Sequence, residues 1–333
     1  MNKASLGHFL SRKKTSAGKL RSFRAPAKRK IALPATVFEF QPEYLLGARI
    51  FRSFRRVASV AVGALDAGAL TPHLGRPNVA KLDEVARKAR GVASALGTER
   101  GPFGLLLPDA AVRVSILEFQ TLPADHKEQA SLVRWKMKPL LPFPLEEARI
   151  SFEVAPGESG GVEAVVMAVR KSVLAEYESI LDSLNGDVNL VLPASAALLP
   201  LLNENAEGGE MLLNVSPSYL TVVVAKAGQI RLWRNKALHG KSEEEGLAAV
   251  AEEAMRSLAA SVDHLKIEIS RVCVSARPAL SRTWVTDLEK KLGRKIGSVV
   301  SPGLPLRMKL TSEEVQIFNE FGATVSGLLV NAA

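Results

Sequence analysis

A pattern of three strand-like segments followed by a helix occurs twice in this chain, and it limits the fold more than any other feature. In the first half, segments 36–40, 45–51 and 57–65 have strand-like apolar patterns, and a helix with Asn78 as its N-cap follows them. In the second half, segments 210–215, 219–225 and 229–233 precede a helix over about 242–265. We therefore expect two related α/β modules, although no repeat is visible at the level of residues.

A smaller α+β unit interrupts the first module. Segment 113–119 is typical of a strand, Asp125 and Glu128 form a capping-box-like helix start, and 150–154 and 162–169 are typical of two further strands. This order predicts a strand-helix-strand-strand insertion. The expected domains are a basic tail (1–33), the first part of one lobe (34–110), the insertion with the return to that lobe (111–190), and a second lobe with a C-terminal helix (191–330).

The formal net charge of +10 comes entirely from the N-terminal tail. Residues 1–30 contain ten Lys and Arg and no acid, which leaves 44 − 10 = 34 basic residues against 34 acidic ones in the remainder. A basic tail rich in Ser, Ala and Gly cannot bury enough apolar surface to offset its ordering entropy, so we expect it to be disordered. It suits an anionic membrane surface or nucleic acid without sequence preference. Two plainer interpretations, a solvated tail and a start codon placed too early, stay open.

Composition argues against several classes of protein. Hydrophobic residues make up 47% of the chain, yet no run of about 18 apolar residues predicts a transmembrane helix. The single cysteine, Cys273, cannot form an intramolecular disulfide, which favours a cytosolic setting. The five histidines show no metal-ligand spacing, so no metal site is expected.

Two motif matches fail on their context, and no catalytic residue is predicted. Segment 157–161 fits G-x-S-x-G, but it lies between two predicted strands, where glycines suit a hairpin loop. Gly240-Lys241-Ser242 resembles the end of a Walker A loop, but Asn235 stands where that loop needs its first glycine. The simpler interpretation is that Ser242 caps the following helix.

Short motifs between Leu107 and Leu202 resemble the PilM family of type IV pilus assembly. They are Leu107-Pro108-Asp109 followed by Val112-Arg113, Leu122-Pro123, the proline-rich segment 138–147, and Leu192-Pro193-Ala194-Ser195. The resemblance covers about residues 34–330. It implies an actin-like (ribonuclease-H-like) ATPase fold of two related mixed-sheet lobes, with the insertion as a subdomain of the first. It also implies a cytoplasmic platform, peripheral to the inner membrane, that holds the cytoplasmic peptide of a PilN-like bitopic membrane protein.

The nucleotide-binding loops of that fold are degenerate in this sequence. Actin-like ATPases hold phosphates and metal with Asp and Gly in two hairpin turns, and the third loop near the adenosine carries a Gly-Gly pair. Here Pro42 removes an N–H donor from the first turn. The degenerate positions are Gln41, Glu43, Asn214, Ser216 and Ser275. We expect a pseudo-ATPase without a cofactor, and ATP with magnesium only if the loops bind despite these changes.

The resemblance places the partner peptide in a groove beside the inserted subdomain, by strand addition or by pockets for apolar side chains. The candidate lining residues are Arg113, Ile116, Phe119, Trp135 and Met137. The alternative that the apolar members of this set are simply core stays open.

Two other functions stay open as well. An ATP-hydrolysing actin-like enzyme of pilus assembly requires intact phosphate loops. A basic-tailed nucleic-acid-binding protein requires a basic folded surface with aromatic side chains, whereas the body is neutral and aromatic residues make up 5% of the chain. No specific nucleic acid is therefore expected, and the resemblance does not separate pilus assembly from type II secretion.

Overall fold

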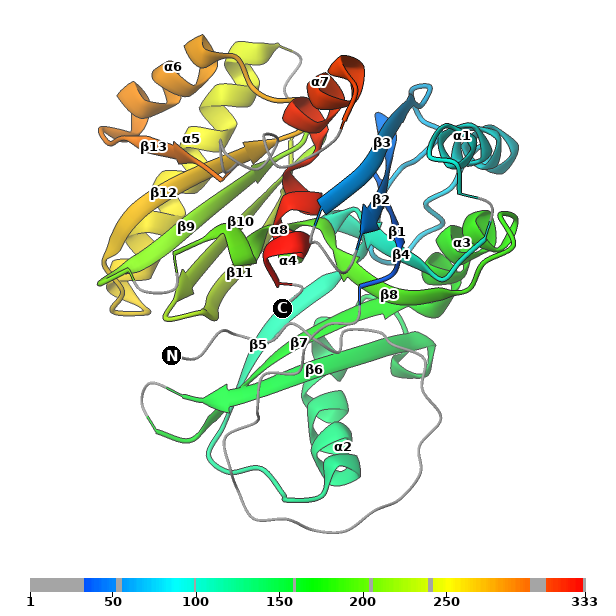
Figure 1. Cartoon of the computed structure of the whole chain (residues 1–333). Coiled ribbons are helices and arrows are strands. Elements are labelled where there is room, and N and C mark those ends of the chain that lie inside the picture. Colours follow the sequence, from blue (N-terminus) through cyan, green and yellow to red (C-terminus); the bar gives the residue numbers. More distant parts are fainter. Residues whose placement is uncertain are drawn as a thin grey trace.

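Two five-stranded mixed sheets with the same strand order organise the chain (Figure 1). The computed structural model describes residues 33–51, 56–98, 100–157, 160–203, 206–238, 242–299 and 310–331. The predicted tail at 1–30, Ser159 and the Gly240-Lys241 pair lie outside the described residues.

The first lobe contains the sheet β3-β2-β1-β4-β8. Its strands are β1 (Thr36–Phe40), β2 (Tyr44–Phe51), β3 (Arg56–Ala64), β4 (Phe103–Leu107) and β8 (Val188–Pro193). The first three form an antiparallel meander, while β4 runs parallel to β1 and β8 runs parallel to β4. Helices α1 (Leu82–Ala95) and α3 (Lys171–Asp182) pack side by side against this sheet, and α4 (Ala194–Leu198) follows β8.

The second lobe repeats this topology in the sheet β11-β10-β9-β12-β13. Its strands are β9 (Gly209–Val215), β10 (Tyr219–Lys226), β11 (Gln229–Ala237), β12 (Ile269–Ala276) and β13 (Ile296–Ser298). The meander is again antiparallel, and β12 and β13 continue it in parallel. Helices α5 (Glu243–Asp263) and α6 (Arg282–Leu292) pack on this sheet. The last two helices, α7 (Ser312–Phe321) and α8 (Ala323–Asn331), return to the first lobe, where α7 contacts β3 and α8 packs on α4. The expectation of two related lobes is confirmed.

The insertion is a three-stranded antiparallel sheet covered by one helix. It consists of β5 (Arg113–Phe119), α2 (His126–Met137), β6 (Ala148–Pro156) and β7 (Val162–Arg170), in the sheet order β5-β7-β6. The Asp125 carboxylate accepts the N–H groups of Lys127 and Glu128 and so caps α2, as its spacing predicts. Short 3₁₀ turns complete the fold: η2 (Asp109–Ala111), η3 (Lys138–Leu140), η4 (Leu145–Glu147) and η5 (Leu199–Leu201).

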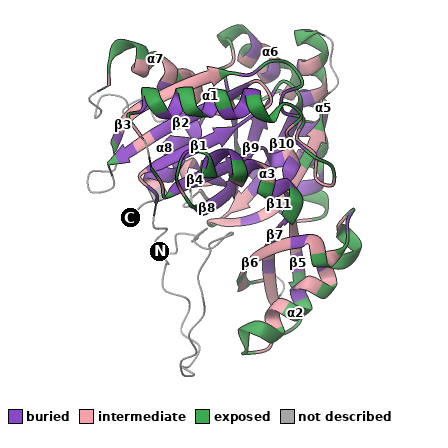
Figure 2. Ribbon diagram, turned by 90° about the vertical axis from the view of Figure 1, so that its right-hand side faces the viewer, coloured by how far each residue is buried: buried purple, intermediate pink, exposed green. Residues whose placement is uncertain are grey.

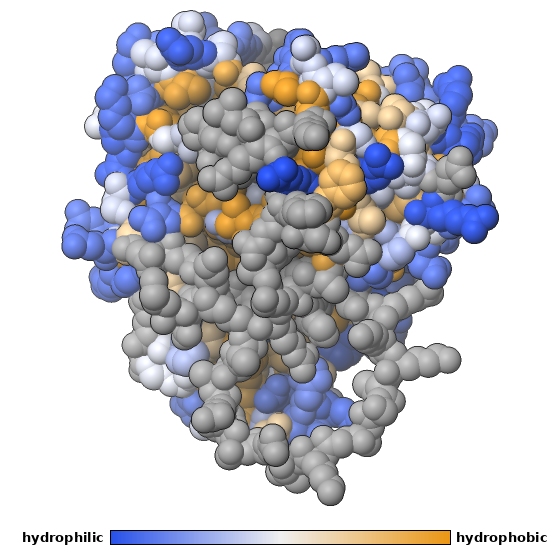
Figure 3. Space-filling view, in the orientation of Figure 1, coloured by the Kyte–Doolittle hydropathy of each residue, from blue (hydrophilic) through white to orange (hydrophobic). Residues whose placement is uncertain are grey.

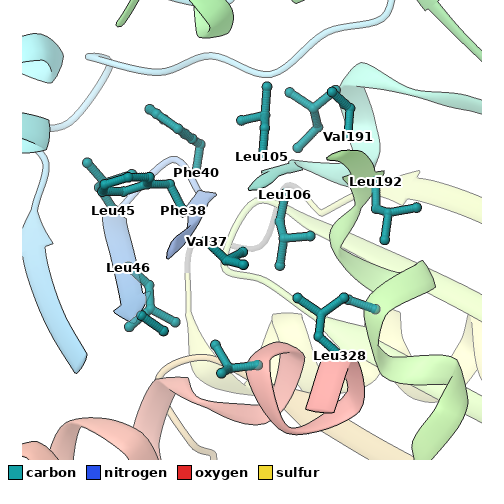
Figure 4. Packing of buried hydrophobic residues seen from close by; sticks show 14 of the residues in the cluster. Val37, Phe38, Phe40, Leu45, Leu46, Leu105, Leu106, Val191, Leu192 and Leu328 are labelled. Atoms are coloured by element: carbon teal, nitrogen blue, oxygen red, sulfur yellow. The ribbon is translucent and has the colours of Figure 1, made fainter. Parts of the chain in front are cut away.

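The main apolar core lies between the sheet of the first lobe and the helices α1, α3, α4 and α8 (Figure 4), whereas α5 and α6 pack on a separate core of the second lobe. Every residue of β1, β4 and β9 is buried, because these central strands are covered on both faces. Figure 2 shows this burial in the sheets and the exposed sides of α1 and α2. In the orientation of Figure 1, hydrophilic residues form the outline of the upper half and hydrophobic ones lie towards its middle (Figure 3).

The prediction that Asn78 caps the first helix is wrong. Helix α1 begins at Leu82, four residues later, and Leu82 itself is exposed. Asn78 is fully buried, and its amide donates to the carbonyl oxygens of His73 and Arg76 at 2.8 and 2.7 Å. The residue therefore holds the preceding loop together.

Candidate functional site at the junction of the two lobes

The carboxyl ends of the central strands of both sheets converge between the lobes. In open α/β sheets this edge is the usual place for a ligand. Two β-hairpin turns, after β1 and after β9, reach this region, and the segments that follow β4, β8 and β12 join them.

A buried ion pair joins the lobes at this point. Glu39, on β1, is 1% exposed and accepts a hydrogen bond from Nε of Arg277 at 2.9 Å. The same carboxylate accepts from Tyr44 and from the Thr324 hydroxyl on α8. Because every acceptor oxygen of Glu39 has a donor, this buried charge is satisfied.

A second buried cluster lies beside the first. Asp109, after β4, accepts the Ser195 N–H at 2.9 Å, the Ser195 hydroxyl, and the Asn214 amide at 3.0 Å. All three residues are at most 1% exposed. Burial raises the pKa of the Asp109 carboxyl above its ordinary value, with hydrogen bonds from Ser195 acting in the opposite direction.

The two clusters are related by the duplication of the fold. Glu39 and Asn214 occupy the same place in equivalent strands, two residues before the hairpin turn. Each contacts a residue that follows the parallel strand of the opposite lobe, Arg277 after β12 and Asp109 after β4. A hydroxyl group donates to the carboxylate in each cluster. Thr324, which donates to Glu39, is the second residue of α8, and Ser195, which donates to Asp109, is the second residue of α4. The lobes are thus joined by two reciprocal polar clusters.

The hairpin turns themselves carry a repeat that sequence inspection missed. Gln41-Pro42-Glu43-Tyr44-Leu45 and Ser216-Pro217-Ser218-Tyr219-Leu220 share the pattern x-Pro-x-Tyr-Leu at equivalent places. In each turn the first residue donates its N–H to the tyrosine carbonyl, at 2.9 and 2.8 Å. The signal was present in the sequence, but five residues are too few to detect without knowing where to align them.

Both tyrosine hydroxyls point into the junction. Tyr44 donates to Glu39 at 3.1 Å, and Tyr219 donates to the Gln41 side chain at 2.5 Å. Burial raises the pKa of both phenols well above the ordinary value, so both stay protonated and able to donate. Burial acts to lower the pKa of Arg277, but the Glu39 charge and both phenols outweigh it, so the guanidinium stays charged.

Four of the five predicted loop positions lie at this junction as buried polar residues. Gln41, Asn214, Ser216 and Ser275 are between 1% and 9% exposed. Gln41 bridges Glu39 and Tyr219, and the Ser275 hydroxyl accepts from Arg277 at 3.2 Å. Glu43 is half-buried at the turn, with a pKa raised by burial. Glu39, Asp109 and Arg277 were not predicted as site residues, although Asp109 belongs to the motif that carries the resemblance. The other local signal is the charged Glu39 in the mostly apolar β1.

The five predicted peptide-binding residues do not form one surface. Met137, the last residue of α2, is fully buried against the sheet of the inserted subdomain, so it cannot line a groove, and its assignment was wrong. Ile116 packs towards the main core, whereas Phe119 packs on the opposite face of the sheet with the α2 cluster. Arg113 is exposed at the start of β5, and Trp135 is 68% exposed on α2.

Comparison with known proteins identifies the fold. No protein-family model and no curated protein sequence matches the chain. A structure of the PilM-PilN type IV pilus biogenesis complex matches with a TM-score of 0.75 and 17% identity, over 92% of this chain and 100% of that chain. This chain has the actin-like ATPase fold. A Bacteroides thetaiotaomicron protein described as having an actin-like ATPase fold and unknown function matches with a TM-score of 0.51 and 11% identity, over 89% of this chain and 95% of that one.

The two hairpin turns beside the polar clusters are the ones that the resemblance implies as phosphate-binding turns. Neither turn contains glycine, and Pro42 and Pro217 remove an N–H donor from each. The Arg277 cation is held by Glu39, so a phosphate would have to displace that carboxylate. Among the residues that the structure describes, no group of three His, Cys, Asp or Glu side chains is placed to hold a metal ion. These residues do not fit a nucleotide.

Proposed function

We propose that this chain is a non-catalytic scaffold of type IV pilus assembly, or of a related secretion system, that docks the cytoplasmic peptide of a PilN-like membrane protein. The observation that carries the proposal is the match to the PilM-PilN complex along nearly the whole chain. The scaffold would lie in the cytoplasm, peripheral to the inner membrane. In the described part of the chain, no helix has the length and apolar character needed to span a bilayer.

The non-catalytic part of the proposal rests on the junction between the lobes. A single hydrogen bond to a charged group contributes about 1.5–3 kcal/mol, so losing two or three such bonds to phosphate would weaken nucleotide binding by a few powers of ten. The reciprocal clusters also join the lobes through side-chain contacts. A protein driven by nucleotide binding needs instead a cleft between the lobes that can open. The role assigned to this junction is to hold the two lobes in one arrangement.

Titration with a fluorescent ATP analogue and magnesium, with unlabelled ATP as competitor, tests this assignment. We expect no competable binding at micromolar concentration. A nucleotide-binding actin-like ATPase assayed in parallel shows that the analogue reports binding. Tight competable binding would sink the pseudo-ATPase proposal and favour the nucleotide-hydrolysing alternative.

Partner docking is proposed in a groove beside the inserted subdomain. Arg113, at the start of β5, is exposed there, and Ile116 on the same strand is half-buried. A labelled peptide from the cytoplasmic N-terminus of a PilN-like protein of the same organism should bind with increased fluorescence anisotropy. Arg113→Glu should weaken that binding, whereas Arg87→Glu, an exposed arginine on α1, should not. Equal affinity of all three proteins would exclude Arg113 from the docking site.

The basic tail would add attraction to an anionic leaflet, at about 1 kcal/mol per basic residue close to the headgroups. Deleting residues 1–30 should reduce co-sedimentation with anionic liposomes and leave peptide binding unchanged. Undiminished liposome binding would remove the tail from the proposal.

A further inference from the structure

Helix α2 lies at the end of the molecule farthest from the two lobes (Figures 1 and 2), and it exposes apolar side chains. Trp135 is 68% exposed, Leu132 is 38% exposed and Leu140, in the turn after the helix, is 36% exposed. Leu132 and Trp135 are three residues apart and therefore share one face of the helix. Of the eight large apolar side chains that are exposed in the described part of the chain, four (Leu132, Trp135, Leu140 and Val154) lie on this subdomain.

The packing of the subdomain does not require these side chains. Helix α2 is attached to its sheet through Val133 and Met137, both fully buried, with Ala164, Val166 and Ala168 beneath them. Trp135 points away from this contact. A tryptophan at the surface leaves a large apolar area in contact with water. Binding to a partner therefore explains the position of this side chain better than the fold does.

The segment that carries these side chains is basic, although the body of the protein is neutral. Segment 126–141 contains Lys127, Arg134, Lys136 and Lys138 against the single acid Glu128, a difference of 4 − 1 = +3. Arg134 and Lys136 donate to the carbonyl oxygens of Leu145 and Glu118, and the Lys136 ammonium also lies 4.4 Å from the centroid of the Phe119 ring. None of the four basic side chains forms an ion pair with an acidic side chain in the described ranges.

We propose that this face of α2, formed by Leu132, Trp135 and Leu140 and accompanied by the four basic residues of the same segment, binds an anionic lipid bilayer. Tryptophan and leucine beside lysine and arginine are the composition of helices that lie in the membrane interface. The side chains protrude from a helix at the tip of the molecule, which suits a flat surface better than a bound peptide. A symmetric contact with a second copy would bring two basic faces together, which their charges oppose. The proposal goes beyond partner docking, because it needs neither the peptide nor the basic tail.

The emission of Trp135 tests this contact in the full-length chain. The other two tryptophans, Trp284 at 6% exposure and the half-buried Trp233, are packed in the protein, so the spectrum of the wild type minus that of Trp135→Phe isolates Trp135. Vesicles containing phosphatidylglycerol should shift this emission to shorter wavelength, and brominated lipids should quench it. Vesicles of phosphatidylcholine alone should do neither.

Vesicle association provides the second measurement. Trp135→Ala should weaken association with anionic vesicles about tenfold, because the side chain loses its burial in the interface. Met255→Ala, which removes an exposed apolar side chain from α5 of the second lobe, should leave it unchanged. Vesicle binding without any change in Trp135 emission would overturn the proposal and assign all binding to the tail. A Trp135 shift caused by the PilN-like peptide without lipid would overturn it in favour of a peptide site.

Discussion

Replacing Arg277 by methionine removes the charge that pairs with Glu39 while keeping most of the side-chain volume. Glu39 would remain at about the same depth, 1% exposed, with its remaining donors Gln41, Tyr44 and Thr324. Removing one partner of a buried ion pair costs about 3–5 kcal/mol, because the other charge is left uncompensated. Since whole proteins are stable by only about 5–15 kcal/mol, we expect a large loss in the free energy of unfolding.

Urea unfolding at pH 7, followed by circular dichroism, measures that loss by linear extrapolation. Adding Glu39→Gln to Arg277→Met should restore about 1–3 kcal/mol, because a neutral amide costs less to bury than an unpaired carboxylate and still accepts hydrogen bonds. Glu39→Gln alone should destabilise the protein, because it leaves the Arg277 charge unpaired. A loss below about 1 kcal/mol for Arg277→Met, or a double variant no more stable than the single one, would refute the reasoning.

Three further predictions concern the core around this junction. Gly327→Ala should lower the melting temperature, because a Cβ there would lie 1.9 Å from the Ala197 carbonyl oxygen and force α8 away from α4. The expected cost is about 1–3 kcal/mol or more. Gly246→Ala, in open space on α5, is the matched control and should not lower the melting temperature. Because burial raises the pKa of Asp109 in the folded protein, its contribution to stability is full below the unfolded pKa and is lost as pH rises through the folded pKa. The unfolding free energy of the wild type minus that of Asp109→Asn should therefore fall as pH rises above the unfolded pKa of about 3.9, and a constant or rising difference would contradict this sign. Burial raises the pKa of the Cys273 thiol to about 11, so a thiol reagent at pH 8 should react slowly with the native protein and at once in denaturant; immediate native reaction would place Cys273 at the surface.

The local elements of this protein could be predicted from its sequence. The limits of β1 and β5 coincide with the predicted segments, and Asp125 and Ser242 cap α2 and α5 as their spacing indicates. These features depend on residues within one or two turns of each other, so local chemistry decides them. Asn78 fails as a cap for a tertiary reason. Two backbone N–H groups in its loop, those of Asn78 and Val79, are held instead by the Glu176 carboxylate of α3.

Side-chain placement on α2 was decided by tertiary packing. Trp135 and Met137 are two residues apart, about 200° around a helix, so one of them must face away from whatever the other contacts. Which of the two is buried depends on how the helix sits on β5 and β7, and the structure buries Met137.

The junction shows the same division most clearly. The sequence by itself determined that glycine and aspartate are missing from the turns, because that is a property of single positions. Which contacts the residues at this junction make with one another was decided only by the tertiary structure. Glu39 and Arg277 are 238 residues apart, and the charge of either would be too costly to bury alone. The duplicated lobes bring the two side chains within hydrogen-bonding distance, and their attraction offsets the free-energy cost of burying both charges.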